Sequence, residues 1–557
     1  MSVIGARSTG RRSAGTRSRH ADLVITGADV YPVDAARSWA GAVAVRGDRI
    51  VAVGSDDEVR ELVGPRTEHL HLPGRMVLPG FQDAHVHPPF AGLDRMRVSL
   101  HDAASRQECL DLVGRYAQEN PELEWITGGG WSMEHFPGGT PVKEDLDAVV
   151  GNRAVFLFNR DVHGAWVSTR ALELAGITAD TPDPISGRVE RDPVTGEPTG
   201  TLHEGAAYQL RDQLLPPPTR REWEAAILDA QAYLHSLGIT GWQDAWVTPA
   251  TLEAYRSLAG AGRLTARVVG ALWWERSRGL EQIPELVEQR ERGGAPGFHP
   301  RTVKIMADGV LENYTGALLE PYCDGCGGST ANSGLDFVEP DLLGAAVTQL
   351  DRLGFQVHMH AIGDRAVRNC LDAVEKAVTA TGRRDSRHHI AHVQLVHPAD
   401  VPRFRELGVV ANLQAYWAQS DVQLEELTRP FLGEERMATM YPFGDFLRSG
   451  AVLAMGSDWA VSTPDPLAQI EVAVRRLGRG DDAEPFLPDQ RIPLPDAISA
   501  FTAGSAYVNH DEAGGVLASG RRADLAVVDR NLFACEQGRV GDARVELTVA
   551  SGRVVHR

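Results

Sequence analysis

The chain has 557 residues, of which 43% are hydrophobic and 24% are charged, proportions typical of a soluble globular protein with a sizeable core. Its formal net charge of −19 argues against nucleic acid or an anionic membrane surface as a partner. No run of about eighteen apolar residues occurs, so we expect no membrane-spanning helix.

The first twenty residues have a composition of their own, with five arginines and no acidic residue. Arg11 and Arg12 form a pair like that of a twin-arginine export signal, but the following segment, "SAGTRSRHADL", has no apolar stretch. We therefore predict a disordered basic tail over residues 1–20.

Short runs of alternating apolar and polar residues fill residues 21–79, as in "DLVITGADVYPVD" and "GAVAVRGDRIVAVG". They predict strands of a small antiparallel unit with Gly-Asp turns. Residues 506–557 return to the same pattern in "RRADLAVVDR" and "RVELTVASGRVVHR". We therefore predict one small β-sandwich built from both ends of the chain.

The middle of the chain, residues 80–505, alternates apolar runs with amphipathic helical segments such as "DRAVRNCLDAVEKAVTATG". Alternating strands and helices predict a parallel sheet, and eight such units predict an α/β fold of the (β/α)8 TIM-like barrel type. The first run is "RMVLPGFQDAHVH", and the other seven lie at residues 238–246, 264–274, 302–309, 354–364, 387–396, 408–417 and 451–461.

A long stretch at about residues 100–220 separates the first predicted barrel strand from the second. It is too long for an ordinary connection between a strand and a helix. We predict an inserted subdomain after the first strand, which arches over the barrel mouth as a lid or a substrate wall.

The predicted barrel strands begin with apolar residues and end with polar ones. Asp83, His85 and His87 occupy every second position of the first run, so on a strand they would share one face. Barrel enzymes carry their active sites at the carboxyl ends of the strands, where these residues fall. The later runs carry Asp244, Lys304, Asp308, His358, His360, His392, Gln414 and Asp458 at corresponding positions.

Histidines and a carboxylate at one barrel mouth predict a metal site. Neutral imidazoles and a carboxylate suit Zn²⁺, with Mn²⁺, Fe²⁺, Co²⁺ or Ni²⁺ as alternatives. Five such groups leave room for one or two metal ions and an open position for water. These groups are His85, His87, His360, His392 and Asp458.

The five cysteines of the chain are few and scattered, which suits a reducing cytoplasm better than a disulfide framework. Cys323 and Cys326 have the spacing of a zinc-binding pair, but no second pair follows. The glycines around them favour a turn and a structural or incidental role.

The segments "GFQDAHVHP", "VKIMADG", "VHMHAIGDRAV", "HIAHVQLV" and "GSDWAVSTPDPL", in that order, resemble those of the metal-dependent amidohydrolase superfamily. The chain is most similar to amidohydrolase family 3, which includes the N-substituted formamide deformylases. The likeness covers nearly the whole chain, from "ADLVITGADVYPVD" to "GRRADLAVVD". It implies a small-molecule substrate and a homodimer.

The resemblance implies a binuclear metal site. One metal would be bound by His85, His87 and Asp458, and the second by His360 and His392.

The resemblance also implies a bridge between the two metals, a carboxylated Lys304. Carboxylation needs a neutral amine, so Lys304 must have a lowered pKa. The alternative is an ion pair between Lys304 and Asp308 without a metal bond. His358 would leave the strand on the same face as His360, and we interpret it as a barrel-interior partner, with a ligand role as the weaker option.

The expected chemistry is hydrolysis of a C–N bond, most simply an amide, with an N-formyl or N-acyl group as the candidate. A metal-bound water would attack the carbonyl, and Asp458 would accept its proton and return it to the leaving amine. Two alternatives stay open. One is a deaminase or cyclic-amidine hydrolase, although "VHMHAIGD" lacks the glutamate that a mononuclear deaminase usually uses. The other is a non-catalytic regulatory or binding protein, although all the expected metal ligands are intact.

Several polar and aromatic residues are candidates for substrate binding, with packing as the alternative role of each. In "DVHGAWVS", His163 is the preferred substrate contact. The others are Trp131 in the insertion and, at the barrel ends, Trp273, Asn313, Tyr314, Gln414 and Trp459.

Overall fold

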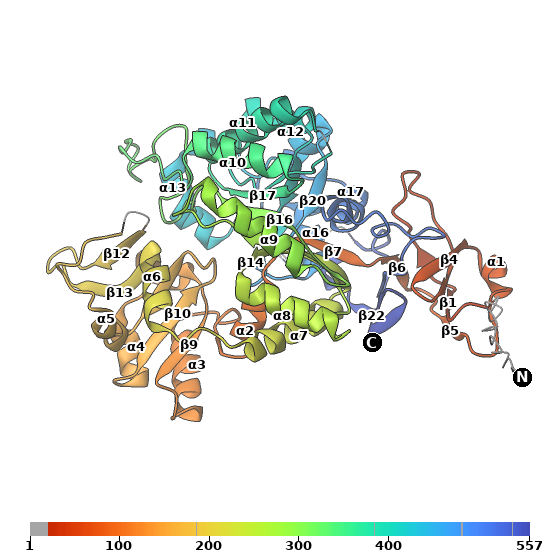
Figure 1. The fold of residues 1–557 in the computed structure, drawn as a ribbon, viewed down its shortest axis with the longest axis horizontal. Coiled ribbons are helices and arrows are strands. Elements are labelled where there is room, and N and C mark those ends of the chain that lie inside the picture. The colour runs from red at the N-terminus through yellow and green to blue at the C-terminus, as the bar shows by residue number, and fades with distance from the viewer. Residues whose placement is uncertain (1–19, 185–186, 384, 479, 481–482, 537–538) are drawn as a thin grey trace, which may run out of the picture.

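The structure, a computed structural model, describes residues 20–557 except 185–186, 384, 479, 481–482 and 537–538. The basic tail predicted over residues 1–20 lies outside the described residues, apart from its last residue. Within the described ranges, no helix is both long enough and apolar enough to cross a membrane. An inserted subdomain, a barrel and a sandwich follow one another along the long axis of the molecule (Figure 1).

Eight parallel strands form the barrel sheet, and they lie side by side in chain order. The predicted (β/α)8 fold is confirmed, since each expected run overlaps one of these strands. Beyond the last strand, Asp458 N–H donates to His85 O over 2.8 Å and His87 N–H donates to Trp459 O over 2.8 Å, which joins the last strand to the first. The strands are β7 (Phe81–Val86), β14 (Ile239–Val247), β15 (Arg267–Trp273), β16 (Phe298–Met306), β17 (Gln356–Ala361), β18 (His389–His392), β19 (Val410–Leu413) and β20 (Leu453–Met455).

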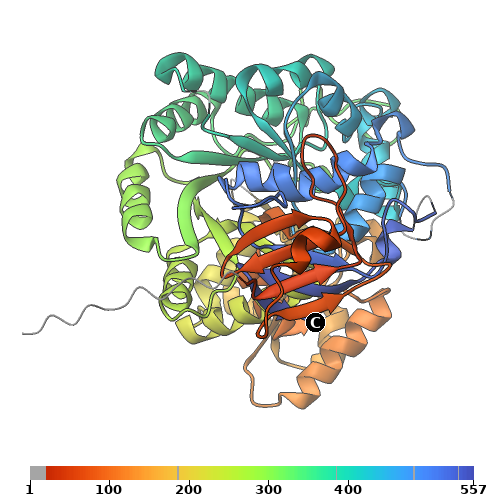
Figure 2. The ribbon, with the colours of Figure 1, turned by 90° about the vertical axis from the view of Figure 1, so that its right-hand side faces the viewer.

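Helices surround the barrel strands (Figure 2). In α11, the buried residues Val367, Cys370, Leu371 and Val374 recur at helical spacing, which turns one apolar face toward the sheet. The surrounding helices are α2 (Pro88–Arg95), α7 (Arg220–Ser236), α8 (Pro249–Gly260), α9 (Ile283–Gly293), α10 (Pro340–Arg352), α11 (Asp364–Thr381), α12 (Val401–Leu407), α15 (Phe443–Ser449) and α16 (Pro466–Arg475), and shorter ones are α13 (Arg429–Leu432), α14 (Glu434–Met437), α17 (Leu494–Ser499) and α18 (Ser505–Val508).

The predicted sandwich of both chain ends is confirmed, because β6 (Met76–Pro79) pairs antiparallel with β21 (Leu525–Val528). The expectation of a purely antiparallel unit is wrong. β1 pairs parallel with β5, and β2 pairs parallel with β6, since a longer segment of chain returns between the members of each pair. One sheet has the order β4 (Arg49–Gly54), β3 (Ala42–Arg46), β1 (Leu23–Thr26) and β5 (Glu68–His71), and the other has β2 (Asp29–Val30), β6, β21, β22 (Val545–Ala550) and β23 (Arg553–His556). The short helix α1 (Asp56–Arg60) follows β4.

The run "RMVLPGFQDAHVH", predicted as the first barrel strand, forms two strands, so the prediction of a single strand was wrong. Gly80 separates β6, which belongs to the sandwich, from β7, which belongs to the barrel. A side chain at position 80 would begin 2.4 Å from the hydroxyl oxygen of Thr240 on β14, so the close approach of two strands requires glycine there.

The chain between α2 and α7 forms a subdomain with its own sheet of six strands. It lies at the end of the barrel opposite the sandwich (Figure 1). The sheet order is β12 (Gly187–Arg191), β13 (Pro198–Glu204), β11 (Gly164–Val167), β10 (Ala154–Asn159), β9 (Trp125–Trp131) and β8 (Val98–Ser99), and the helices are α3 (Arg106–Glu119), α4 (Lys143–Val150), α5 (Thr169–Ala175) and α6 (Gly205–Leu214).

Candidate metal centre

His85, His87 and Asp458 form a compact group at the carboxyl ends of the first and last barrel strands. Oδ1 of Asp458 lies 3.1 Å from Nε2 of His85 and 2.9 Å from Nε2 of His87. His85 and Asp458 are buried, and His87 is partly exposed. Burial lowers the pKa of His85 to about 3. Burial alone would raise the pKa of Asp458, but the two histidines hold it well below the usual range, so the carboxylate is ionised.

The backbone around this group is held by a second aspartate and by a glycine. The buried carboxylate of Asp83 accepts hydrogen bonds from the N–H of His85 at 2.9 Å and of Ser457 at 3.1 Å. Asp83 therefore joins the two strands and is not itself one of the three grouped residues. A side chain at Gly456 would begin 2.5 Å from the backbone nitrogen of His85, so the glycine of "GSD" permits this close approach.

Asp458 and His392 both have left-handed backbone conformations, with φ of 56° and 79°. Such a conformation costs a non-glycine residue about 1–3 kcal/mol and persists only where the surroundings impose it. Both residues lie at the barrel mouth, so the surrounding structure imposes a strained backbone at two positions of this site.

His360 and His392 lie beside the first group. Their rings are 4.5 Å apart, and the ring of His392 is 4.8 Å from that of His85. Nε2 of His360 lies 3.1 Å from the carbonyl oxygen of Gly309, so this nitrogen donates and Nδ1 keeps its lone pair. Nδ1 of His392 is buried without a hydrogen-bond partner among the described residues and lies 3.9 Å from Oδ2 of Asp458.

Lys304 on β16 is almost completely buried, and burial lowers its pKa to about 7. A substantial fraction of its amine is therefore neutral near physiological pH, as carboxylation requires. The alternative partner, Asp308, uses its carboxylate otherwise, because it accepts hydrogen bonds from the backbone N–H groups of Ala317, Ile362 and Gly363 at 2.8–3.0 Å.

The donor set fits a divalent metal ion. Imidazole nitrogens and a carboxylate converge, and two of the buried nitrogens, Nδ1 of His87 and Nδ1 of His392, have no hydrogen-bond partner within the described chain. These are the ligand types of zinc and related transition metals.

His163, on the inserted subdomain, reaches the barrel site, and its ring lies 5.8 Å from that of His360. Its Nδ1 is 2.9 Å from Oε1 of Glu204, which also accepts a hydrogen bond from the Thr315 hydroxyl at 3.1 Å. Burial alone would lower the pKa of His163, but the Glu204 carboxylate raises it to about 9. Sequence analysis missed Glu204, although an acidic residue at the end of the apolar run "GTLHEGAA" was a usable signal.

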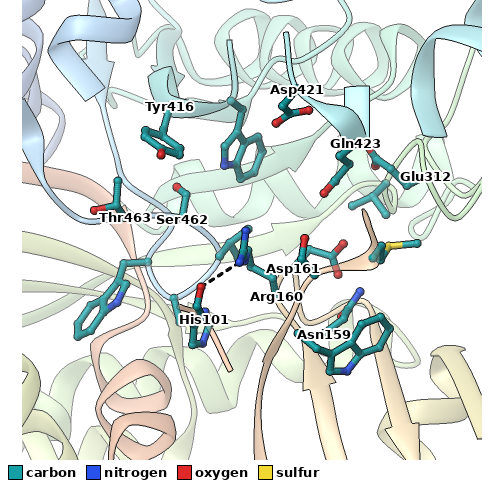
Figure 3. Close-up of a pocket in the computed structure, with 18 of the residues that line it drawn as sticks. His101, Asn159, Arg160, Asp161, Glu312, Tyr416, Asp421, Gln423, Ser462 and Thr463 are labelled. Atoms are coloured by element: carbon teal, nitrogen blue, oxygen red, sulfur yellow. Dashed lines mark hydrogen bonds between the residues drawn. The ribbon is translucent and has the colours of Figure 1, made fainter. Parts of the chain in front are cut away.

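A cavity of about 340 Å³ lies between the inserted subdomain and the barrel mouth. Trp131 of the subdomain and Trp459 of the barrel line it, as does Trp417, whose ring stacks on His392 at 5.2 Å. The cavity therefore reaches the histidine cluster through Trp417 and Trp459, although none of the candidate metal ligands lines it. Figure 3 shows polar side chains from both bodies around it, including His101, Asn159, Arg160, Asp161, Glu312, Tyr416, Asp421, Gln423, Ser462 and Thr463.

The remaining substrate-binding candidates make internal contacts. Asn313 Nδ2 donates to the carbonyl oxygen of His163 over 3.3 Å, and Gln414 Oε1 accepts from the backbone N–H of His392 at 2.7 Å. The ring of Tyr314 packs edge-on against Phe431 at 5.0 Å, and that of Trp273 lies 5.1 Å from Trp246. Gln414 thus supports the backbone of a histidine, while Trp131 and Trp459 face the cavity.

Comparison with protein families finds one match across most of the chain. The model of the amidohydrolase family matches residues 70–556. A short second match, over residues 41–62, is to a bacterial imidazolonepropionase-like composite domain.

Individual relatives agree with the family match. The chain is 30% identical to N-substituted formamide deformylase of Arthrobacter pascens, over 95% of this chain and 97% of the relative. It is also 30% identical to Protein LONG AFTER FAR-RED 3 of Arabidopsis thaliana, over 92% of this chain and 88% of the relative. Among solved structures, an uncharacterized metal-dependent hydrolase from Pyrococcus furiosus superposes with a TM-score of 0.69 at 26% identity, covering 91% of this chain and 99% of the other.

Proposed function

Since the chain belongs to the amidohydrolase family, we propose that it hydrolyses a carbon–nitrogen bond, most simply an amide, in a small molecule. The observation that carries this proposal is the group of His85, His87 and Asp458 at the barrel mouth, next to a cavity of small-molecule size. The protein is thus a hydrolase whose own donor set fits the metal dependence of its structural relative.

We assign the metal ligands as two sets. His85, His87 and Asp458 would hold one divalent ion, and His360 and His392 would hold a second. Lys304, carboxylated on its amine, would bridge them. Zinc suits these donors, with manganese, iron, cobalt or nickel as alternatives. A metal ion bound here supplies Lewis acidity, which polarises a carbonyl group and lowers the pKa of water.

Asp458 is the proposed general base. Its carboxylate is ionised and buried, so it can take a proton from the attacking water and return it to the departing nitrogen. This return matters because an amine anion is a very poor leaving group. His163, held by Glu204, is the proposed substrate contact from the subdomain, and Trp131 and Trp459 would form walls of the binding site. Weaker candidates for substrate contact are Asn313, Tyr314 and Gln414.

We propose an N-formyl or other N-acyl compound as the substrate. The supporting relative is the deformylase of Arthrobacter pascens, which matches nearly the whole chain. We also propose a cytoplasmic homodimer, and the five cysteines without disulfide bonds support the reducing compartment. Light scattering of the purified protein tests the dimer.

The function is tested by measuring metal content and hydrolysis together. Protein purified without chelator should contain about two metal ions per chain and release amine from members of a panel of formamides and N-acyl amines. Release of ammonia from amino-substituted heterocycles instead of amide cleavage would indicate a deaminase. Protein that contains no metal and regains none with zinc would refute the proposal.

A further inference from the structure

A connected series of buried polar side chains runs through the barrel interior to His85. Its members come from five strands of the barrel, two of them from β17, and all are at most 2% exposed. Because hydrogen-bond donors must face acceptors, such a series can fix the position of each proton along it. The members are Gln356, Gln243, His358 and His85, with His389 and Asn412 as a side branch.

The orientation of the Gln356 amide is fixed by two backbone carbonyl groups. Its Nε2 lies 2.6 Å from the oxygen of Arg387 and 2.7 Å from the oxygen of Val508. Carbonyl oxygens only accept, so this atom must be the amide nitrogen. Oε1 then accepts from the hydroxyl of Thr302 at 2.7 Å and from Nε2 of Gln243 at 3.3 Å.

The orientation of Gln243 follows from that of Gln356. Its nitrogen faces Gln356, so its oxygen faces two histidines, 2.8 Å from Nδ1 of His358 and 3.0 Å from Nε2 of His389. An amide oxygen cannot donate, so Nδ1 of His358 must carry a proton. The ring is completely buried, and no carboxylate of the described residues lies within ion-pair distance of it, so it carries a single proton and Nε2 of His358 is an acceptor.

The last link reaches the metal centre. Nε2 of His358 lies 2.8 Å from Nδ1 of His85, so Nδ1 of His85 donates. With Nδ1 of His85 committed to His358, Nε2 is the nitrogen that faces Asp458, 3.1 Å from its Oδ1. Nε2 is therefore the ring nitrogen of His85 that can bind a cation together with this carboxylate.

We propose that Gln243 and His358 fix His85 in the tautomer with its proton on Nδ1, which prepares Nε2 as a metal donor. His358 is thus a positioning residue for His85. The proposal rests on the metal site proposed above, and it adds residues from the barrel interior that act through a ligand without touching the metal.

The side branch supplies a matched control. His389 shares the Gln243 oxygen, is as deeply buried as His358, and its ring lies 3.9 Å from that of His358. Its Nδ1 accepts from Asn412 at 3.1 Å, and that amide also donates to the carbonyl oxygen of Ala84 at 2.9 Å. His389 therefore shares the burial and the Gln243 partner of His358 but makes no hydrogen bond to His85.

The test compares three variants by competition with a zinc chelator, after circular dichroism has checked their folding. His358→Leu should weaken zinc affinity about 10–100-fold, the usual effect of removing a group that orients a metal ligand. His358→Gln should keep most of the wild-type zinc affinity, since the amide of the new side chain can accept a hydrogen bond from His85 and donate one to Gln243. His389→Leu should weaken affinity much less than His358→Leu. Equal losses in both leucine variants, or affinity unchanged in His358→Leu, would overturn the proposal.

A second measurement uses the metal-free protein and does not depend on metal binding. Nitrogen-15 NMR of labelled histidines, with His85 assigned by substitution, should show its proton on Nδ1. In His358→Gln this tautomer should persist. A proton on Nε2 of His85 in the wild-type protein would refute the proposed effect of Gln243 and His358 on His85. If the wild-type protein binds no metal, the proposed function fails. The tautomer of His85 still decides whether Gln243 and His358 fix its proton on Nδ1.

Discussion

Asp458 is buried, and the neighbouring histidines keep its pKa low. Its backbone is held in a left-handed conformation by the joined ends of two strands. A group constrained in this way is placed for chemistry at the expense of stability.

Replacement of Asp458 by asparagine should reduce kcat by about 10²–10⁴-fold, the usual contribution of a general acid–base group. The amide oxygen can still face a metal ion, so elemental analysis should find metal in the variant. Activity and metal content are measured on the same preparation. Full activity with metal present would remove Asp458 from its catalytic role.

At the scale of single residues, the sequence allowed the grouped residues to be predicted but not their protonation. His85, His87 and Asp458 were identified from strand ends and from the resemblance, and the structure brings them together. The proton positions on His85 and His358 could not be predicted, since they depend on amide orientations set by carbonyl groups distant in the sequence. Glu204 was missed because its importance arises from contact with His163 across two strands.

The apolar face of the helix α11 packs against the barrel. Leu371 is completely buried there, whereas Leu174 in α5 is 44% exposed. Leu371→Ala should therefore lower the free energy of unfolding by about 2–5 kcal/mol, because it removes buried contacts and leaves a cavity. Leu174→Ala should change it by no more than about 0.5 kcal/mol. Urea denaturation of both variants measures the difference, and similar effects would contradict this account of α11.

Asp351, near the end of α10, contacts the end of α11 and the residues just before β18. Its carboxylate accepts hydrogen bonds from Thr381 and Ser386 and lies 3.2 Å from Nε2 of His388. Burial alone would raise its pKa, but these partners lower it to about 2, below the usual 3.8. The folded state therefore gains stability from this group above pH 3.8, and loses it as the pH falls toward 2.

Asp351→Asn should lower the free energy of unfolding by about 1–2 kcal/mol at pH 7, a value reduced for solvent screening. The difference from the wild-type protein should shrink as the pH falls from 4 to about 2. Denaturant titrations across this range provide the measurement. A difference that does not depend on pH would exclude the carboxylate charge as its source.

Whole elements were predictable where their patterns were local. The helix α11 and the eight barrel strands have apolar spacings that can be recognised without a structure. The break at Gly80 could not be seen, because the alternating pattern continues through it, and what ends the strand is the approach of Thr240 from another part of the chain. The parallel pairing of β1 with β5 also depends on a contact distant in sequence.

For the molecule as a whole, metal should contribute to stability. A ligand that binds only the folded state stabilises it by mass action, by about 4 kcal/mol at a thousandfold excess over Kd. Removal of metal with a chelator should therefore lower Tm, and zinc should restore it, as followed by calorimetry. In the His85→Ala variant, the chelator should lower Tm by less than in the wild-type protein. A Tm unaffected by the chelator, in protein shown to lose its metal, would contradict a metal bound by the joined strands.

The barrel closes where Asp458, beyond its last strand, meets His85 and His87 of its first. During synthesis on the ribosome, these histidines emerge more than 370 residues before the aspartate that completes their group. The sandwich also joins early and late parts of the chain, because β6 is synthesised long before its partner β21. A nascent chain therefore lacks the third member of the trio until most of the sequence has been made. We expect metal to load at the proposed site only after Asp458 has been synthesised, and not during the folding of the first half of the chain.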